Sequence, residues 1–172
     1  MKQLKELFSP VVELVGFLTW DVFRFLLSDT ISLIKIVMAN LLSLILPRTG
    51  VDTIETSTIS RDKAVVSAYI NDPLVYLGKI SARLGAELIG TMQEIKHTMP
   101  QVRLPILIMH GTGDRLCDPE GSLMLYERVG SPDKTLKLYD GFYHEIFNEP
   151  EHEQVFKDIE EWLDAHMGSG RD

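Results

Sequence analysis

A short apolar run that ends in a glycine-rich turn constrains the fold of this chain more than any other feature. Residues 104–109, "LPILIM", are almost all apolar, as expected for a parallel strand covered on both faces. Residues 119–129 begin with Pro and Glu and are followed by Gly130, which predicts a helix. Residues 135–139, "TLKLY", read as a second strand. The sequence therefore predicts a strand–helix–strand unit with a right-handed crossover and two parallel strands.

Apolar periodicity predicts three further helices, at residues 61–77, 80–97 and 150–166. The first two are joined around Asn71-Asp72-Pro73, which is expected to form a turn or a helix start. The last one is amphipathic and closes the chain. Its predicted inner face consists of Val155, Phe156, Ile159, Trp162 and Leu163. Residues 47–62, which are rich in Thr and Ser, are expected to form a loop.

An Asp and a His follow the two predicted strands. Parallel strands end at one edge of their sheet, so the loops that hold Asp114 and His144 are expected to lie side by side. A carboxylate bonded to an imidazole fixes its tautomer and stabilises the imidazolium that forms when the ring accepts a proton. Taken alone, Asp114 would read as a turn residue that caps local amides. The joint occurrence of the two residues predicts an acid–base pair, whereas His110, at a strand end, is interpreted as structural.

The first 46 residues are unusually apolar. Residues 8–27 carry a narrow polar stripe of Glu13, Asp21 and Arg24, and residues 31–46 are interrupted by polar side chains. Neither stretch offers about 20 uncharged apolar residues, so a simple transmembrane span is not expected. Two interpretations remain open. These helices pack in a core or interface, or they dock on lipid or acyl chains, which would make the protein peripheral to a membrane.

The acidic composition excludes some partners. A net charge of −8 argues against nucleic acid, which requires a basic face. The single cysteine, Cys117, excludes an internal disulfide and a zinc site built on several cysteines. No small-residue cleavage site follows the weakly basic start, so a cytoplasmic location is expected.

Several stretches are similar to the C-terminal part of monoacylglycerol lipases, within the α/β-hydrolase superfamily. The similar stretches are "PILIMHGTGDRLCDPEGS", "DKTLKLYDGFYHEIFNEPE" and "FKDIEEWL". Farther upstream, "LLSLILP", "STISRD" and "YINDPL" resemble the cap and lid region of that family. The resemblance divides the chain into a cap-like region at 31–100 and a βαβα core at 101–166. Residues 1–30 look unrelated to the family, and 167–172 are expected to form a disordered tail.

The resemblance implies an α/β fold, a truncated α/β-hydrolase whose short parallel sheet is flanked by helices and preceded by an apolar helical region. It implies that Asp114 is the acid and His144 the base of a catalytic triad acting on acylglycerols or other carboxylic esters. The acyl chain would bind along residues 31–46, with Met38, Leu41 and Ile45 lining its path. Neither a metal nor an organic cofactor is implied.

The family's nucleophile has no counterpart in this sequence. The Ser of G-x-S-x-G and the upstream oxyanion loop do not occur. Cys117, Ser122, Ser67 and the serines of residues 57–60 are the candidate substitutes within the chain.

Three interpretations follow from the missing serine. The chain is a weakened esterase with a substitute nucleophile, a non-catalytic fragment that binds lipid or a partner, or one half of a split hydrolase. Two parallel strands leave unpaired edges, which favours a homodimer or a complementing chain.

Overall fold

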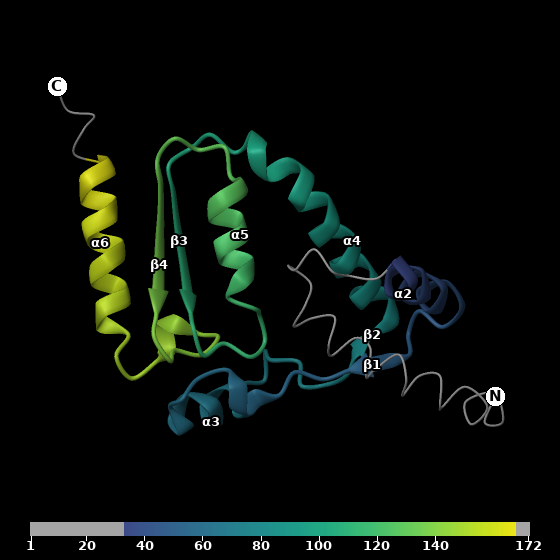
Figure 1. Cartoon of the computed structure of the whole chain (residues 1–172). Coiled ribbons are helices and arrows are strands. Elements are labelled where there is room, and N and C mark those ends of the chain that lie inside the picture. Colours follow the sequence, from purple (N-terminus) through teal and green to yellow (C-terminus); the bar gives the residue numbers. More distant parts are fainter. Residues whose placement is uncertain (1–32, 168–172) are drawn as a thin grey trace. The chain divides into compact units, whose positions relative to one another are not determined.

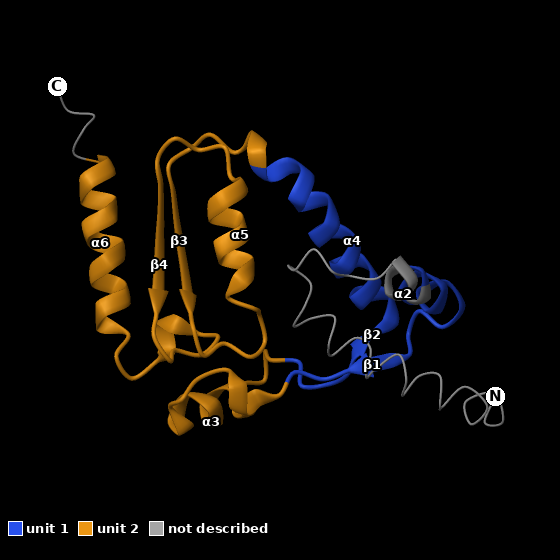
Figure 2. Ribbon diagram, viewed as in Figure 1, with its two compact units in different colours: residues 1–54, 76–99 blue, residues 55–75, 100–172 orange. Residues whose placement is uncertain are grey.

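The computed structural model describes residues 33–167, which form two compact units (Figures 1 and 2). Within these residues the first unit comprises 33–54 and 76–99, and the second comprises 55–75 and 100–167. The predicted helical segment at 1–30, with its polar stripe, and the tail beyond Met167 lie outside the described residues.

The first unit contains two helices and a small antiparallel sheet. Its elements are α2 (Leu33–Ile45), β1 (Gly50–Asp52), β2 (Ile80–Ser81) and α4 (Ala82–Thr98). The hydroxyl of Ser81 accepts a hydrogen bond from the amide of Leu84 at 3.2 Å, which caps the start of α4. The buried side chains of Leu42 and Ala82 pack together, with Leu46 and Val51 against them.

Helix α2 is apolar on its exposed side as well as on its buried side. Leu42 is buried, whereas Leu41 and Ile45 are 49% and 59% exposed. The side chain of Met38, the third predicted acyl contact, lies outside the described residues. Among the described helices, none has both the length and the apolar character that crossing a bilayer requires.

The second unit contains the predicted strand–helix–strand arrangement, which is confirmed. Its elements are η1 (Thr56–Thr58), α3 (Lys63–Asn71), β3 (Ile106–Gly111), α5 (Glu120–Arg128), β4 (Lys134–Tyr139), η3 (Ile146–Asn148) and α6 (Glu153–Met167). Strands β3 and β4 are parallel, in a register from Ile106 opposite Lys134 to Gly111 opposite Tyr139. Both strands therefore end at the same edge of the sheet.

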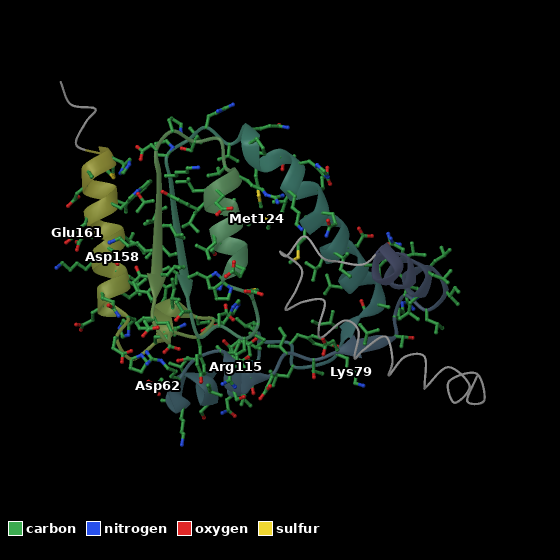
Figure 3. The ribbon with its side chains drawn as sticks, in the orientation of Figure 1. Asp62, Lys79, Arg115, Met124, Asp158 and Glu161 are labelled. Carbon is green, nitrogen blue, oxygen red and sulfur yellow. The ribbon has the colours of Figure 1, made fainter. Side chains whose placement is uncertain are left out.

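Helices α5 and α6 lie on opposite sides of the two strands (Figures 1 and 3). Figure 3 shows Met124 on α5 and Asp158 on α6, one on each side. The carboxylate of Asp158 accepts hydrogen bonds from Lys137 at 3.0 Å and from the Tyr139 hydroxyl at 2.8 Å, which links α6 to β4. Two-sided cover explains why residues of β3 read as a continuous apolar run.

The predicted inner face of α6 is only partly right. Val155 is fully buried and packs with Tyr139, Phe142 and Ile146, but Phe156 and Leu163 are 50% and 42% exposed. Val155, Ile159 and Trp162 repeat at helical spacing and form the contact stripe. Phe156 and Leu163 each follow a stripe residue by one position, which turns them about 100° away from the core.

Helix α3 ends at Asn71, so the predicted turn around residues 71–73 is confirmed, whereas the predicted helical extent to residue 77 is wrong. Asp72 has an extended backbone, with ψ of 118°, as expected for a residue before proline. Its carboxylate accepts a hydrogen bond from the amide of Leu74 at 2.8 Å, so the chain turns there. The predicted loop at 47–62 contains the short strand β1 and the 3₁₀ turn η1.

Candidate functional site

The carboxylate of Asp114 is held by its own loop just beyond β3. Its Oδ1 atom accepts hydrogen bonds from the amides of Leu116, at 2.7 Å, and Cys117, at 3.0 Å. The turn-capping role that the sequence suggested is therefore present. It uses only one carboxylate oxygen, however, so Oδ2 remains available for other donors.

The structure brings together the two predicted site residues. The Nδ1 atom of His144 lies 2.9 Å from Oδ2 of Asp114, although 30 residues separate them in the sequence. His144 follows β4 and Asp114 follows β3, so the parallel register produces the meeting. The Asp114 side chain is 2% exposed and that of His144 is 37% exposed. A buried acid thus supports a histidine that solvent and a reactant can reach.

Backbone contacts hold the acid loop against the histidine loop. The amide of Thr112 donates to Tyr139 at 2.9 Å, and the amide of Gly113 donates to Phe142 at 2.8 Å. Gly141, between the two acceptors, has a φ of +71°, a conformation that favours glycine. A Cβ atom on Gly111 would lie 2.3 Å from the carbonyl oxygen of Phe142. Glycine at 111 therefore permits the approach on which the Asp114–His144 contact depends.

Substituting Ala for Gly111 is expected to destabilise the protein by about 1–3 kcal/mol, because the added methyl group forces the two loops apart. Gly90→Ala is the matched control, since nothing lies within 4 Å of a Cβ at that exposed position of α4. There the same change is expected to stabilise by about 0.5–1 kcal/mol. Urea unfolding measures both values. Equal effects of the two substitutions would show that the loop contact is not tight.

Hydrogen bonding sets the charge state of the pair. Burial raises the pKa of Asp114, but hydrogen bonds from His110, His144 and the two amides outweigh it and hold that pKa below its usual range. The hydrogen bond to Asp114, followed by one to Cys117, raises the pKa of His144 to about 10. At neutral pH the pair is therefore a carboxylate and an imidazolium.

Cys117 lies in the same cluster. Its sulfur, a ring nitrogen of His144 and a carboxylate oxygen of Asp114 all lie within 4.8 Å of one another. These are donor types that Zn²⁺ accepts. Both oxygens of Asp114 are already engaged by hydrogen-bond donors, however, so the geometry is that of a hydrogen-bonded acid–base pair. That no metal is implied stays a prediction.

The candidate substitute nucleophiles fall in different places. Ser122 bonds to His110 at 2.7 Å, and Ser67 is exposed beside Asn71. Ser57 donates to Glu55, whereas Ser60 is buried and donates to the carbonyl of Asn148. Cys117 is the candidate whose reactive atom lies close to His144.

An ion pair between the buried Glu149 and the partly exposed Arg61, which also pairs with Glu151, anchors the histidine loop. Glu149 is fully buried, and its carboxylate accepts hydrogen bonds from the guanidinium of Arg61 and from the backbone amides of Arg61, at 2.9 Å, and Tyr143, at 3.3 Å. The guanidinium also lies 4.9 Å from the centre of the Phe142 ring. In addition, the amide of Glu145 donates to Ile59 at 2.9 Å. The segment before α3 therefore fixes the loop that carries His144.

Sequence reasoning missed three residues of this arrangement. His110 was interpreted as structural, yet its Nε2 atom lies 3.1 Å from Oδ2 of Asp114. The four-residue spacing of His110 and Asp114 across a glycine turn could have indicated that contact. The Arg61–Glu149 pair spans 88 residues, and no local pattern indicates it.

The fold and this site together define a partial α/β-hydrolase. The chain belongs to the family described as serine aminopeptidase S33, whose profile matches residues 18–151. It is 38% identical over 139 residues to the monoacylglycerol lipase of Mycolicibacterium smegmatis, covering 81% of this chain and 50% of that lipase. It is 36% identical to human monoglyceride lipase, covering 75% of this chain and 43% of that enzyme.

A solved structure is similar over the same share of this chain. The crystal structure of Paleococcus ferrophilus monoacylglycerol lipase matches with a TM-score of 0.70 and 33% identity. The match covers 81% of this chain and 55% of that protein. The chain thus spans about half the length of the relatives that it matches.

Proposed function

We propose that this chain carries the acid–histidine half of a carboxylic-ester hydrolase of the monoacylglycerol lipase type. The observation that supports the proposal is the 2.9 Å contact between Oδ2 of the buried Asp114 and Nδ1 of the exposed His144. The relatives at 36–38% identity are named for hydrolysis of monoacylglycerols, which supports the substrate class.

In this function Asp114 orients His144, and the Nε2 atom of His144 exchanges the proton. Neutral His144 accepts the proton of the nucleophile and then donates it to the leaving alcohol. Asp114 stays ionised throughout, because four hydrogen-bond donors surround its carboxylate. Without the family's oxyanion loop, turnover by this chain alone is expected to be weak, since such a donor contributes about 10²–10³ in rate.

The exposed apolar side chains of helix α2 are consistent with a substrate that carries an acyl chain. Leu41 and Ile45 expose large apolar side chains on one helix, which is suited to contact with a fatty chain. The proposal places the protein in the cytoplasm, where such a surface also permits peripheral contact with a membrane.

The β3–β4 sheet favours a second candidate, a split hydrolase. In the described part of the chain each of these strands pairs only with the other, so each has an edge without a strand partner. A complementing chain, or a second copy, would cover such an edge and could supply the nucleophile.

The deciding experiment is hydrolysis of a monoacylglycerol and of a short-chain nitrophenyl ester by the purified chain. We expect weak turnover that His144→Ala abolishes and that His97→Ala, an exposed histidine on α4, leaves unchanged. Intact mass after excess fluorophosphonate counts the adducts, and mass analysis of the digested peptides then locates the nucleophile. Turnover that survives His144→Ala would contradict the proposal, and turnover that requires an added chain would support the split enzyme instead.

The same assay is expected to show a strong pH dependence. Because a base must be neutral and the pKa of His144 is raised to about 10, the rate should rise about tenfold per pH unit from pH 7 until about pH 10. The pH profile of kcat/KM measures this. A profile that is flat between pH 7 and pH 9 would exclude His144 as the base.

A further inference from the structure

A second histidine binds the carboxylate that orients His144. The Nε2 atom of His110 lies 3.1 Å from Oδ2 of Asp114, the same oxygen that His144 approaches. His110 is the penultimate residue of β3, and its side chain is 13% exposed. Because side chains alternate along a strand, Met109 packs against the Tyr139–Val155 cluster and His110 points to the other face. On that face it meets Ser122 of α5.

The partners of His110 assign its protons. Ionised Asp114 can only accept, so Nε2 of His110 must carry a hydrogen. The other ring nitrogen, Nδ1, lies 2.7 Å from the hydroxyl of Ser122. In a neutral ring that nitrogen accepts, and the hydroxyl donates to it. The carboxylate of Asp114, and the carbonyl of Cys117 at 3.3 Å from the same nitrogen, therefore select the tautomer of His110, and the hydroxyl of Ser122 holds the other side of the ring.

This contact completes the fixation of the carboxylate. The amides of Leu116 and Cys117 hold Oδ1 alone, and a carboxyl group held at one oxygen can still turn the other. His110 holds Oδ2 from the α5 side, which leaves the remaining acceptor direction of that oxygen for His144. The sulfur of Cys117 lies within 4.8 Å of the side chains of Asp114 and His144, and the guanidinium of Arg115 lies 5.8 Å from the centre of the Tyr143 ring.

We infer that His110, held by Ser122, is a positioning residue that fixes the carboxylate of Asp114 for its hydrogen bond to His144. The inference rests on the proposed function for its catalytic meaning, but the geometry that it describes exists without turnover. His110 acts through Asp114 and need not touch a substrate. The inference is therefore tested by comparing two substitutions at position 110, one that keeps a hydrogen-bond donor and one that keeps only the bulk of the side chain.

The test follows the Nδ1 proton of His144 by proton NMR at pH 6, where that ring is charged, and assigns it by its loss in His144→Gln. His110→Gln keeps an N–H donor toward Asp114, whereas His110→Leu keeps the bulk and removes the donor. We expect solvent exchange of the proton to be at least tenfold faster in His110→Leu and within about threefold of the parent in His110→Gln. Ser122→Ala should accelerate it as well, and Ser67→Ala, on exposed α3, should not.

Two results would overturn the inference. One is parental exchange in His110→Leu, and the other is equal acceleration by Leu and by Gln. Thermal unfolding of each variant identifies any general loss of structure. If a variant at position 110 does not fold, the exchange rate in Ser122→Ala, a smaller change, decides whether the inference holds. Where the chain hydrolyses esters, His110→Leu should lower kcat and leave KM unchanged. If the proposed function fails and no turnover exists, the exchange rates still decide the role of His110.

Discussion

Replacing Asp114 with Asn is expected to lower the pKa of His144 from about 10 toward its ordinary value of 6.5. The carboxylate is the largest contribution to the raised pKa of His144, and Asn carries no charge. The amide oxygen can still accept from Leu116 and Cys117, but the amide nitrogen would then face two imidazoles. Any ester turnover is expected to fall about 10⁴-fold, as when the acid of such a triad becomes an amide.

The pKa change is measured by NMR titration of the His144 ring, and turnover by the ester assay at pH 8. Asp164→Asn on α6 is the matched control, because it removes the same charge from an exposed helix position outside both site loops. It should leave both quantities unchanged. A pKa of His144 that stays near 10 in Asp114→Asn would show that Cys117, and not Asp114, governs the charge of the ring.

The stability of the folded chain should also depend on this pair. The raised pKa of His144 contributes stability that is fully present below pH 6.5 and is lost as the pH rises through about 10. The lowered pKa of Asp114 contributes stability that is present above pH 3.8 and is lost as the pH falls through its folded value. Between those limits the two effects overlap, so the pair is most stabilising from about pH 4 to pH 6.5.

Topology made the central pair predictable from the sequence. An apolar run, a helix with clear start and stop signals and a second strand fix a parallel unit, and parallel strands end at one edge. The proximity of Asp114 and His144 follows from that rule, because each residue lies in the loop after one of the two strands. The ends of the helices followed less well, because the turn at Asp72 ends α3 and the side-chain cap at Ser81 starts α4.

Side-chain direction and long-range pairing were not predictable. His110 was assigned a structural role because a histidine at a strand end does not by itself reveal which face of the sheet it occupies. Nor does it reveal that Ser122 contacts it on that face. Gly111 and Gly113 matter through backbone approach to residues 141–142, and a turn-rich sequence does not distinguish such glycines from ordinary turn glycines. Burial of Glu149 depends on Arg61 from a distant segment, which only the assembled fold brings near.

Replacing Glu149 with Gln is expected to destabilise the second unit by about 1–3 kcal/mol, because it weakens the charge-assisted hydrogen bonds of a buried carboxylate. The guanidinium of Arg61 is 32% exposed and keeps its ion pair with Glu151, which limits the loss. The amides of Arg61 and Tyr143 share one carboxylate oxygen, so the new amide nitrogen must turn toward the guanidinium, where it offers a donor to a donor. Urea unfolding measures the loss.

Glu161→Gln is the control, since that glutamate is 63% exposed and pairs with Lys157 at 3.7 Å. Its loss should change the free energy of unfolding by no more than about 0.5 kcal/mol. The double variant Arg61→Met with Glu149→Gln should recover part of the stability, because it removes the guanidinium donor that the new amide nitrogen faces, while the amide oxygen still accepts from the backbone amides of residues 61 and 143. The pKa of His144 is measured in the same variants. If the double variant regains stability but the pKa of His144 stays away from its parental value, the ion pair also sets the position of the histidine loop, whose Tyr143 amide it binds. A Glu149→Gln variant whose free energy of unfolding lies within about 0.5 kcal/mol of the parent would contradict the role given to the pair.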